Sequence, residues 1–423
     1  MTEIIPSVRG MRDVLFADAG RLSHIESVFR LVLESYSFEE IRTPIVEYEQ
    51  LFKRGLGEST DAVAKEMYRL LDRDEKWLAL RPEGTASVVR AAIQQNLCYD
   101  DRPRLWYMGP MFRYERPQAG RYRQFQHVGA ETLGLEDPLS DFELIQIVTD
   151  VFSELGISSG VQLHINSIGS SDARAQFRAK LVDALQPVSH LLDDDSKTRL
   201  KMNPLRILDS KVPATQVILR DAPKLMDSLS VESKKRFEKV LNLLEKANIP
   251  YKLDHRLVRG LDYYTDTVFE WIGTGVGAQD ALCAGGRYDS LTVLLGGKPT
   301  PGVGFAAGIE RIALLHEQLH DVERISTDIY VVAMEESHQQ YALEVAHLLR
   351  SGSDVRVRQH IGEGKIKTKL RWADRSGATW VLILGDDEQR DRTVTLKWLR
   401  SKRPQETIPL SDLLTTLYAK LEF

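Results

Sequence analysis

Cysteines, long apolar runs and internal repeats are scarce or absent in this sequence. Its 423 residues include two cysteines, Cys98 and Cys283, and no CxxC pair. A zinc module or a disulfide framework needs more cysteines at closer spacing, so both are excluded, and a reducing cytoplasm is the expected location. No stretch approaches the ~18 consecutive apolar residues of a membrane span. The N-terminal segment also lacks the apolar core of a signal peptide.

The overall charge does not select a class of ligand. The formal net charge is -5, with 43% apolar and 28% charged residues, which is the balance of an ordinary globular protein. Such a charge neither indicates nor excludes a nucleic-acid partner, because local patches matter more than the sum. The phosphate-binding loop GxxxxGK[ST] is absent from the sequence.

The sequence divides into several segments, and its length predicts about three domains. Helix and strand patterns mix over residues 1–168, which are expected to form the first part of a core. Residues 169–250 are mostly helical and indicate an insertion, and strand patterns return over 251–322. A charged linker is expected at 319–328. Strands then alternate with helices over 326–423, which predicts a small parallel α/β sheet.

Residues 109–131 combine cationic and aromatic side chains at high density. Four arginines and four rings are interleaved there: Arg113, Arg116, Arg121 and Arg123 with Phe112, Tyr114, Tyr122 and Phe125. Guanidinium groups bind phosphate through paired hydrogen bonds and aromatic faces stack on bases, so the segment favours a nucleotide or nucleic-acid site. A solvated charged hairpin is the alternative interpretation.

The second strand of that hairpin has one polar face. Alternation places Phe125, His127, Gly129 and Glu131 on the same side. A ring, an imidazole, a glycine and a carboxylate make a poor apolar core. This face is therefore predicted to be the floor of a polar pocket, with Gly129 leaving room for a ligand. Taken alone, His127 is equally consistent with a half-buried structural histidine.

The stretch "LRPEGTAS" (80–87) ends a strand and begins a helix. Thr85 or Ser87 as a helix cap, with Glu83 at the positive end of the helix dipole, is the simplest interpretation. A carboxylate and a hydroxyl at a helix start can also hold an ammonium group, so a binding role remains open.

Two further stretches bring arginine to the junctions of strands. "PGVGFAAGIER" (301–311) runs from a glycine-rich strand into a helix that carries Arg311, and its spacing only loosely matches a dinucleotide-binding loop. "RLVRGLDYYT" (256–265) crowds Arg259, Tyr263 and Tyr264 before a strand. A surface arginine with tight packing of strand on helix is the alternative for the first stretch.

Taken together, these stretches resemble the class II aminoacyl-tRNA synthetases. "FEEIRTPIVE" (38–47), the hairpin that starts in "MFRYER" and the strand that ends in "GIER" follow the order of three class II signatures. "RLVRGLDYYT" and "CAGGRYD" are similar to the histidine-binding segments of the histidyl-tRNA synthetase family. "RGMRD", "ALRPEGTA", "NSIGS" and "GKIKTKLRWADRSGA" also fit, so the resemblance covers essentially the whole chain.

The resemblance implies an α+β fold. A class II catalytic domain on an antiparallel sheet would carry a helical insertion and be followed by a small C-terminal α/β anticodon-binding domain. The implied activity is that of a histidine–tRNA ligase, which activates L-histidine with ATP to histidyl-adenylate and pyrophosphate and then transfers histidine to the 3′ end of tRNA(His). Mg²⁺ is expected with the ATP phosphates and without a dedicated metal site. A homodimer with Pro44 at its interface is expected, and no membrane association.

The resemblance also assigns residues to each ligand. Arg259 and Arg113 are expected to be catalytic because both would hold the α-phosphate. The expected histidine-binding residues are Glu83, Thr85, His127, Glu131, Arg259, Tyr263, Tyr264 and Tyr288. The expected ATP-binding residues are Arg113, Glu115, Arg121, Tyr122, Phe125 and Arg311. The residues expected to contact tRNA are Arg116, Gln118, Glu363 and Lys365.

One position departs from the family pattern. The family usually has glutamine where this chain has His127, and here Gln126 stands one place earlier, on the opposite face of the strand. Either His127 takes over the contact to the substrate or the strand slips locally. Two rival functions also remain open at this point. One is a non-catalytic histidyl-synthetase-like regulatory subunit of an ATP phosphoribosyltransferase, and the other is a nucleotide-dependent oxidoreductase.

Overall fold

The computed structural model describes residues 4–58, 60–98, 101–208, 210, 212–274, 281–320 and 327–420. The chain forms two compact units, Met1–Val322 and Glu323–Phe423. Most of the predicted linker at 319–328 lies outside the described residues, as do both predicted boundaries, 322 and 326. Each unit has its own hydrophobic core, and each is described separately below.

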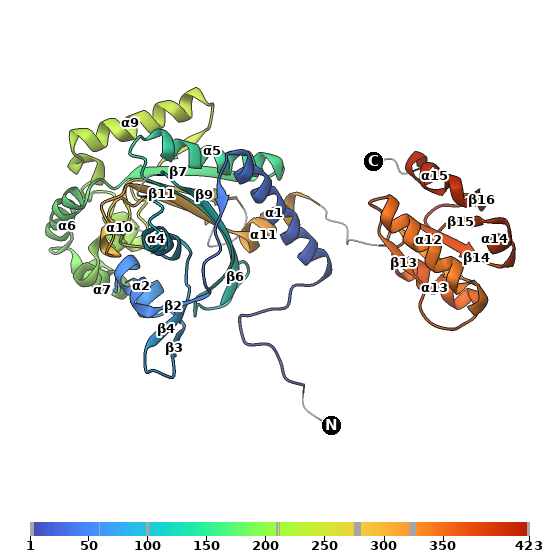
Figure 1. Ribbon diagram of the computed structural model, residues 1–423. Coiled ribbons are helices and arrows are strands. Elements are labelled where there is room, and N and C mark those ends of the chain that lie inside the picture. The colour runs from blue at the N-terminus through green and yellow to red at the C-terminus, as the bar shows by residue number, and fades with distance from the viewer. Residues whose placement is uncertain are drawn as a thin grey trace. The chain divides into compact units, whose positions relative to one another are not determined.

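The first unit is built on an eight-stranded sheet among the described residues (Figure 1). Its strands, in spatial order, are β1 (Glu39–Glu40), β5 (Arg104–Phe112), β6 (Gln124–Leu133), β11 (Gly302–Gly308), β10 (Ala281–Arg287), β9 (Thr265–Gly273), β7 (Val161–Ser167) and β8 (Tyr251–Leu253). Neighbours are antiparallel except for the two outer pairs, β1 with β5 and β7 with β8, which are parallel.

One face of this sheet is apolar and covered by helices. Val128 of β6, Phe305 of β11 and Trp271 of β9 lie in one buried cluster with side chains from these helices. The covering helices are α1 (Phe16–Ser35), α5 (Leu139–Glu154), α9 (Val231–Lys246) and α11 (Ile309–Leu319). Side chains alternate along each strand, so the residues between these apolar ones point to the other face, which is polar.

Apolar residues recur at helical spacing over residues 21–38, which predicts a helix there, and the helix found, α1, has different ends. It begins earlier, at Phe16, and ends at Ser35. Ser37 has a φ of 59°, a left-handed conformation that cannot continue a right-handed helix. The apolar spacing of the segment carries on past the point where the backbone turns, so the pattern alone places the end too late.

A second cluster of apolar residues lies beside the polar face. It includes Phe52, Phe177 and Leu257. A small sheet in the order β2–β4–β3 lies next to it, formed by β2 (Val46–Tyr48), β4 (Trp77–Leu80) and β3 (Arg69–Leu71). The nearby helices are α2 (Glu49–Leu56), α3 (Asp61–Ala64), α4 (Thr85–Gln94) and α10 (Leu291–Leu294).

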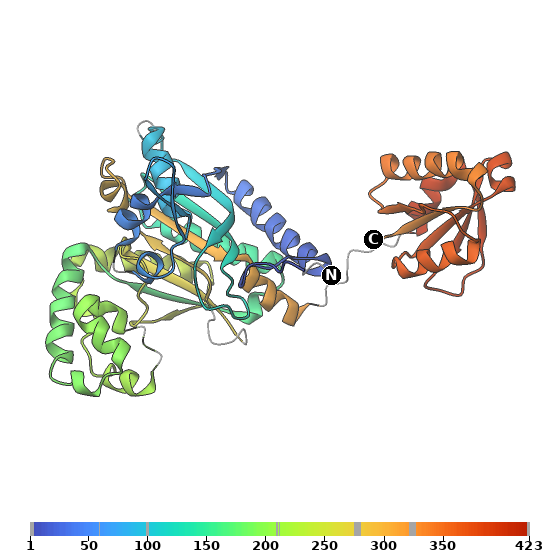
Figure 2. The same ribbon diagram turned by 90° about the horizontal axis from the view of Figure 1, so that it is seen from below.

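The mostly helical segment between β7 and β8 contains α6 (Ser171–Leu185), α7 (Asp194–Met202), α8 (Pro213–Ile218) and α9. Its first three helices form a group at one end of the unit, drawn in green in Figure 2. Phe177 and Leu181 of α6 are buried in the second apolar cluster. By contrast, α9 buries Phe237 and Val240 under the apolar face of the large sheet, so the end of this segment is integrated into the core.

The second unit is a five-stranded sheet in the order β13–β12–β14–β15–β16 among its described residues. Its strands are β12 (Ile329–Ala333), β13 (Val357–Gln359), β14 (Trp380–Leu384), β15 (Thr393–Trp398) and β16 (Glu406–Pro409), and its helices are α12 (Gln339–Gly352), α13 (Ile366–Arg375), α14 (Asp386–Asp391) and α15 (Leu413–Lys420). The sequence predicts a parallel sheet, whereas β15 and β16 pair antiparallel. The segments that connect β14 to β15 and β15 to β16 are shorter than the roughly dozen residues that a crossover between parallel strands needs.

Candidate active site

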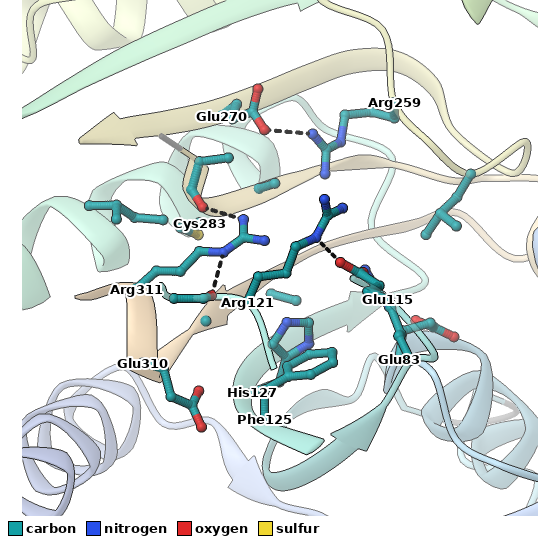
Figure 3. A pocket seen from close by; sticks show the side chains of 18 of the residues that line it. Glu83, Glu115, Arg121, Phe125, His127, Arg259, Glu270, Cys283, Glu310 and Arg311 are labelled. Atoms are coloured by element: carbon teal, nitrogen blue, oxygen red, sulfur yellow. Dashed lines mark hydrogen bonds and ion pairs between the residues drawn. The ribbon is translucent and has the colours of Figure 1, made fainter. Parts of the chain in front are cut away.

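The polar face of the large sheet carries a pocket in which distant segments of the first unit meet (Figure 3). It lies over β6, β11, β10 and β9 and is closed on one side by the start of α4. The predicted site residues that line it are Glu83, Thr85, Arg113, Glu115, Arg121, Tyr122, Phe125, His127, Arg259, Tyr263, Tyr264 and Arg311.

Other predicted residues lie elsewhere. Glu131 and Tyr288 are fully enclosed behind the pocket wall and do not line it. Arg116 and Gln118 are exposed on the turn between β5 and β6.

Cationic side chains dominate the pocket. Figure 3 shows the guanidinium groups of Arg121, Arg259 and Arg311 pointing toward one another. Arg311 donates to the carbonyl oxygens of Ala281 (2.8 Å) and Gly120 (3.3 Å), which fix its orientation. Burial and the neighbouring charges of Arg113 and Arg121 lower the pKa of Arg311 to about 10. These cations repel one another in the free protein, and a polyanion bound among them would relieve that repulsion.

Arg259 is held by the carboxylate of Glu270, which no sequence motif singles out. Its Nη1 lies 3.2 Å from Oε1 of Glu270 on β9, and its Nε is buried without a hydrogen-bond partner among the described residues. Burial alone would lower the pKa of Arg259, but Glu270 and the phenols of Tyr264 and Tyr263 outweigh it and raise that pKa. The guanidinium is therefore charged, oriented by one partner, and keeps unused donors for a ligand.

Arg113 and Arg121 come from the ends of the arginine-rich hairpin. Nε of Arg113 donates to the carbonyl oxygen of Pro82 at 2.9 Å, which ties it to the start of α4. Arg121 is ion-paired with Glu115. Burial in the first place, and like charge in part, lowers the pKa of both arginines. The hairpin therefore places the guanidinium groups of Arg113 and Arg121 in the pocket, while Arg116 remains in solvent.

Two aromatic rings on the hairpin lie beside these cations. Phe125 lines the pocket, and the Arg113 guanidinium lies 5.5 Å from the centroid of its ring. The ring of His127 packs edge-on against Phe125, with the two ring centroids 4.9 Å apart. The ring of Tyr122 is covered on one side by the guanidinium of Arg12, at 4.5 Å. Arg12 lies in the stretch "RGMRD", and no feature of that stretch indicated this contact.

Glu83 acts as the cap of α4, whereas the sequence predicts Thr85 or Ser87 in that role. Its two carboxylate oxygens accept hydrogen bonds from the backbone N–H groups of Thr85 (2.7 Å) and Ala86 (2.9 Å). Burial nevertheless raises the pKa of Glu83. The same carboxylate lines the pocket, so capping and exposure to a ligand occur together at this residue.

Glu131 is the centre of a buried hydrogen-bond network. Its carboxyl accepts from the hydroxyls of Thr85 (2.6 Å) and Tyr288 (2.5 Å). Burial raises the pKa of Glu131 to about 8, although these hydroxyls oppose the shift. The free protein therefore keeps this carboxyl largely neutral at pH 7.

The raised pKa of Glu131 predicts a pH-dependent contribution to stability. The unfolded chain ionises this group near its ordinary pKa of 4.5 and the folded chain near 8, so the contribution is full below 4.5 and is lost as the pH rises through 8. Glu131→Gln removes the titration. The melting temperature of the variant minus that of the wild type is expected to rise steadily across that interval. A difference that stays constant with pH would contradict the assignment.

Gly129 does not leave room for a ligand, contrary to the sequence-based expectation. A Cβ at Gly129 would lie 2.4 Å from the ring of Tyr107 on the neighbouring strand β5 and 2.7 Å from the carbonyl oxygen of Phe305. The missing side chain therefore makes space for a cross-strand tyrosine, and this part of the predicted pocket floor is filled by the protein itself.

His127 faces the pocket and Gln126 does not. The pairing of β6 with β5 runs without interruption through both residues, and its pairing with β11 reaches His127, so the strand does not slip here. The backbone N–H of Gln126 donates to the Glu310 carboxylate at 2.9 Å, which pins the strand in this register. Burial, followed by the charges of Arg113 and Arg311, holds the pKa of His127 well below its usual value. The imidazole is therefore neutral.

In the second unit, Glu363 and Lys365 are exposed in the loop after β13. Glu363 lines a cavity of about 1030 Å³ at the carboxyl ends of β12 and β13, together with Arg358 and His360. The basic residues Lys365, Lys367, Lys369, Arg371 and Arg375 are spaced partly for one helix face, which predicts a solvated surface, but Lys369 is buried. Its ammonium donates to the carbonyl oxygen of Ala333 at 2.8 Å, so it closes the end of β12.

The polar face of the large sheet carries an arginine-rich strand–turn–strand. Beside it, a glycine-rich strand leads into a helix that bears an arginine. This arrangement on an antiparallel sheet defines the catalytic domain of class II aminoacyl-tRNA synthetases. The predicted fold class is confirmed. The family description "Histidyl-tRNA synthetase" matches residues 10–312, and the description "Anticodon binding domain" matches residues 328–420. The chain belongs to the histidyl-tRNA synthetase family.

Individual relatives agree with this assignment. A histidine–tRNA ligase of Halorhodospira halophila is 48% identical over 415 residues, 98% of this chain and 97% of the relative. The crystal structure of apo S. aureus histidyl-tRNA synthetase is 34% identical, covers 98% of this chain and 99% of its own, and superposes with a TM-score of 0.79. A Bacillus halodurans structure named as an ATP phosphoribosyltransferase regulatory subunit/histidyl-tRNA synthetase is 22% identical, covers 91% of this chain and 100% of its own, and has a TM-score of 0.67, which shows the fold alone. No described helix has the length and apolar character to cross a membrane.

Proposed function

We propose that this protein is a histidine–tRNA ligase. It joins L-histidine to ATP, releases pyrophosphate, and transfers the histidyl group from the adenylate to the 3′ end of tRNA(His). The observation that carries this proposal is the convergence of Arg113, Arg121, Arg259 and Arg311 on one pocket that also contains the carboxylate of Glu83 and the paired phenols of Tyr263 and Tyr264.

The first chemical step is an in-line displacement at the α-phosphorus of ATP. An oxygen of the histidine carboxylate forms a bond to this phosphorus while the bond to the β-phosphate bridging oxygen breaks, and pyrophosphate leaves. Charge spreads over the phosphoryl oxygens, so catalysis depends on positioning and on fixed positive charge. Arg113 and Arg259 supply that charge from two sides, because the first is tied to Pro82 and the second to Glu270.

The remaining ATP contacts follow from the same pocket. Arg121 and Arg311 bind the outer phosphates, Glu115 orients Arg121, and the rings of Tyr122 and Phe125 hold the adenine. The described residues contain no group of three or more His, Cys, Asp or Glu side chains arranged to hold a metal. We propose that Mg²⁺ enters with the ATP phosphates and their waters, because this ion is usually bound through substrate phosphates and water.

Histidine binds at the inner end of the pocket. Glu83 and Thr85 hold its ammonium group, and Tyr263, Tyr264 and Glu131 surround the imidazole. In the free protein the Glu131 carboxyl is occupied by Thr85 and Tyr288. Binding therefore replaces one of these partners by an imidazole N–H, and Tyr288 closes the pocket behind it. A site built from such hydrogen bonds rejects apolar isosteres by a factor of about ten thousand.

His127 takes the place of the usual glutamine in contacting the substrate. A neutral imidazole can accept a hydrogen bond from the histidine ammonium, as an amide oxygen does. We expect His127→Gln to keep kcat/KM for histidine within about threefold, and His127→Ala to lower it by about tenfold, the worth of one hydrogen bond. Pyrophosphate-exchange kinetics with histidine as the varied substrate measure both variants, and equal losses would contradict this role.

The remaining proposals concern partners and location. Arg116, Gln118, Glu363 and Lys365 contact tRNA, and the reaction takes place in the cytoplasm. The chain forms a homodimer through the small sheet, where Pro44 and a set of large apolar side chains are exposed: Ile45, Val46, Tyr48, Leu70, Leu71 and Trp77. Sedimentation of the purified chain tests this, because a monomer at micromolar concentration would contradict it.

Histidine-dependent exchange of labelled pyrophosphate into ATP tests the proposed activity. The wild-type protein is expected to show exchange with histidine and none with other amino acids, and to charge tRNA(His) with histidine. Folded protein that binds histidine but shows no exchange would favour the regulatory-subunit alternative, which the 48% identical ligase relative and the retained arginines make less supported.

A further inference from the structure

Residues 8–12, which we call the N-terminal strap, make a tight turn against the arginine-rich hairpin ahead of α1. The carbonyl oxygen of Val8 accepts from the backbone N–H of Met11 at 2.9 Å. Gly10 has a φ of 84°, a left-handed conformation that favours glycine. A Cβ at Gly10 would lie 2.8 Å from Cγ of Arg123 and 2.9 Å from Cγ of Pro117. Both the backbone conformation and the close fit to the hairpin therefore require glycine here.

Arg123 links the strap to the backbone of the hairpin. Its N–H donates to the carbonyl oxygen of Gly10 at 2.8 Å, and its own carbonyl oxygen accepts from the N–H of Arg113 at 3.0 Å. Its guanidinium donates to the carbonyl oxygens of Arg9 (3.3 Å) and Glu115 (3.1 Å). Arg113 and Glu115 line the catalytic pocket, whereas Arg123 does not. This arginine of the hairpin therefore connects the strap to two residues of the ATP site.

The last residue of the strap, Arg12, covers one face of the Tyr122 ring. Its guanidinium carbon lies 4.5 Å from the ring centroid, within the range of a cation–π contact. Nη1 of Arg12 lies 3.7 Å from a carboxylate oxygen of Asp18 in the first turn of α1, which orients the guanidinium. Tyr122 lines the catalytic pocket, whereas Arg12 does not. Any effect of this contact on a ligand therefore passes through the tyrosine ring.

Resting on the proposed function, we propose that the N-terminal strap positions the ATP-binding hairpin and that Arg12 is a positioning residue for the adenine. A tyrosine ring that turns freely must be ordered when a base stacks on it, and this ordering reduces affinity. The Arg12 guanidinium holds one face of the Tyr122 ring and leaves the other for the base, so the ring is ordered before ATP binds. The contacts of the strap with Arg123 have the same effect on the hairpin backbone, which carries Arg113 and Arg121.

The strap contributes little to the stability of the fold. Residues 4–9 and Arg12 are exposed, and the apolar clusters of the first unit, as far as the structure describes it, contain no residue of the strap. The pair of Arg12 with Asp18 is solvent-exposed, and such pairs add little to stability. Variants of the strap are therefore expected to fold and melt like the wild type and to differ in the binding of ATP.

Pyrophosphate exchange by the full-length variant Arg12→Ala tests the proposal, with each substrate varied in turn. We expect the KM for ATP to rise by about fivefold, the size of one partly exposed cation–π contact. The KM values for histidine and pyrophosphate and the kcat are expected to stay within about twofold. Arg12→Lys keeps a cation over the ring and is expected to recover most of the affinity for ATP.

Arg9→Ala is the matched control in the same strap. The contact of Arg9 with the hairpin uses its backbone carbonyl oxygen, which alanine retains. We expect all three KM values to stay within about twofold of the wild type. An increase in the KM for ATP equal to that of Arg12→Ala would show that the loss of any charge from the strap has this effect, and would overturn the role of Arg12.

A double-mutant cycle tests whether Arg12 acts through the ring. Titration with a non-hydrolysable ATP analogue gives the dissociation constants of the wild type, Arg12→Ala, Tyr122→Ala and the double variant. If Arg12 orders the ring, its removal adds nothing to the loss caused by Tyr122→Ala. If its charge instead attracts the nucleotide directly, the two losses multiply, and the proposal is overturned.

Gly10→Ala tests the strap as a whole. The added Cβ has no space against Arg123 and Pro117, so the turn is displaced from the hairpin. We expect the KM for ATP to rise more than it does for Arg12→Ala, with the melting temperature little changed. ATP kinetics equal to those of the wild type, in Gly10→Ala or in Arg12→Ala, would overturn the proposal. Failure of the proposed function is distinguishable, because the wild type would then show no histidine-dependent exchange, whereas the titrations with the ATP analogue still measure the effect of the strap.

Discussion

Arg259→Ala is expected to lower the rate of histidine-dependent pyrophosphate exchange by about a hundredfold or more, while histidine still binds. The guanidinium lies in the pocket with one orienting partner, Glu270, at 3.2 Å and with an Nε that has no partner among the described residues. A donor with free N–H groups beside three other converging cations suits the charge that develops on the α-phosphoryl group. Its loss removes stabilisation of the transition state, whereas Glu83, Tyr263 and Tyr264 still hold the amino acid.

Two measurements separate this role from a merely structural one. Calorimetry is expected to show histidine binding to Arg259→Ala with an affinity reduced far less than the exchange rate. Glu270→Gln keeps the cation but loosens its orientation, so a smaller loss of rate is expected than for the removal of Arg259. Exchange kinetics of Arg259→Ala equal to those of the wild type would refute the catalytic role.

Glu131→Gln is expected to weaken histidine binding by about tenfold, the size of the effect of one neutral hydrogen bond, and to leave ATP binding nearly unchanged. Glu131 lies on the same strand face as His127, is fully enclosed, and touches Thr85 and Tyr288, both of which belong to the proposed histidine site. The amide is nearly isosteric and fits the same space, but it has one acceptor oxygen where the carboxyl has two, and both oxygens of Glu131 already accept hydrogen bonds from Thr85 and Tyr288.

The comparison of the two ligands is decisive for Glu131. Direct titration with histidine and, separately, with a non-hydrolysable ATP analogue gives both dissociation constants for the variant. Equal losses for the two ligands would show that the substitution disturbs the whole pocket and would remove Glu131 from the histidine site.

Strand alternation in β6 was predictable because it is a property of one segment. The period of two placed Phe125 and His127 on one face and Val128 and Ala130 on the other, and the structure has the first pair in the pocket and the second in the core. The same reasoning was wrong for Gly129. The space above it belongs to Tyr107, which is adjacent only through the pairing of β5 with β6.

Partners of buried charges were not predictable in the same way. The sequence singles out Arg259 by its crowded neighbours, but the carboxylate that orients it, Glu270, stands on the following strand among ordinary β-forming residues. Lys369 belongs to a row of basic helix residues that the sequence predicts to be solvated, yet its ammonium is buried against a carbonyl oxygen of β12. Each of these contacts depends on how two elements pack, and no local pattern encodes that packing.

The sequence by itself determined the order of the signature segments and, through their resemblance to a known family, the class of fold and most of the side chains that face the pocket. Motifs and strand alternation extend over a few neighbouring positions, so they can be recognised without the fold. Only the tertiary structure decided which of those side chains meet and which carboxylate holds which cation. The physical reason is that electrostatic and packing contacts are made across strands and helices far apart in the chain, at distances that the sequence does not contain.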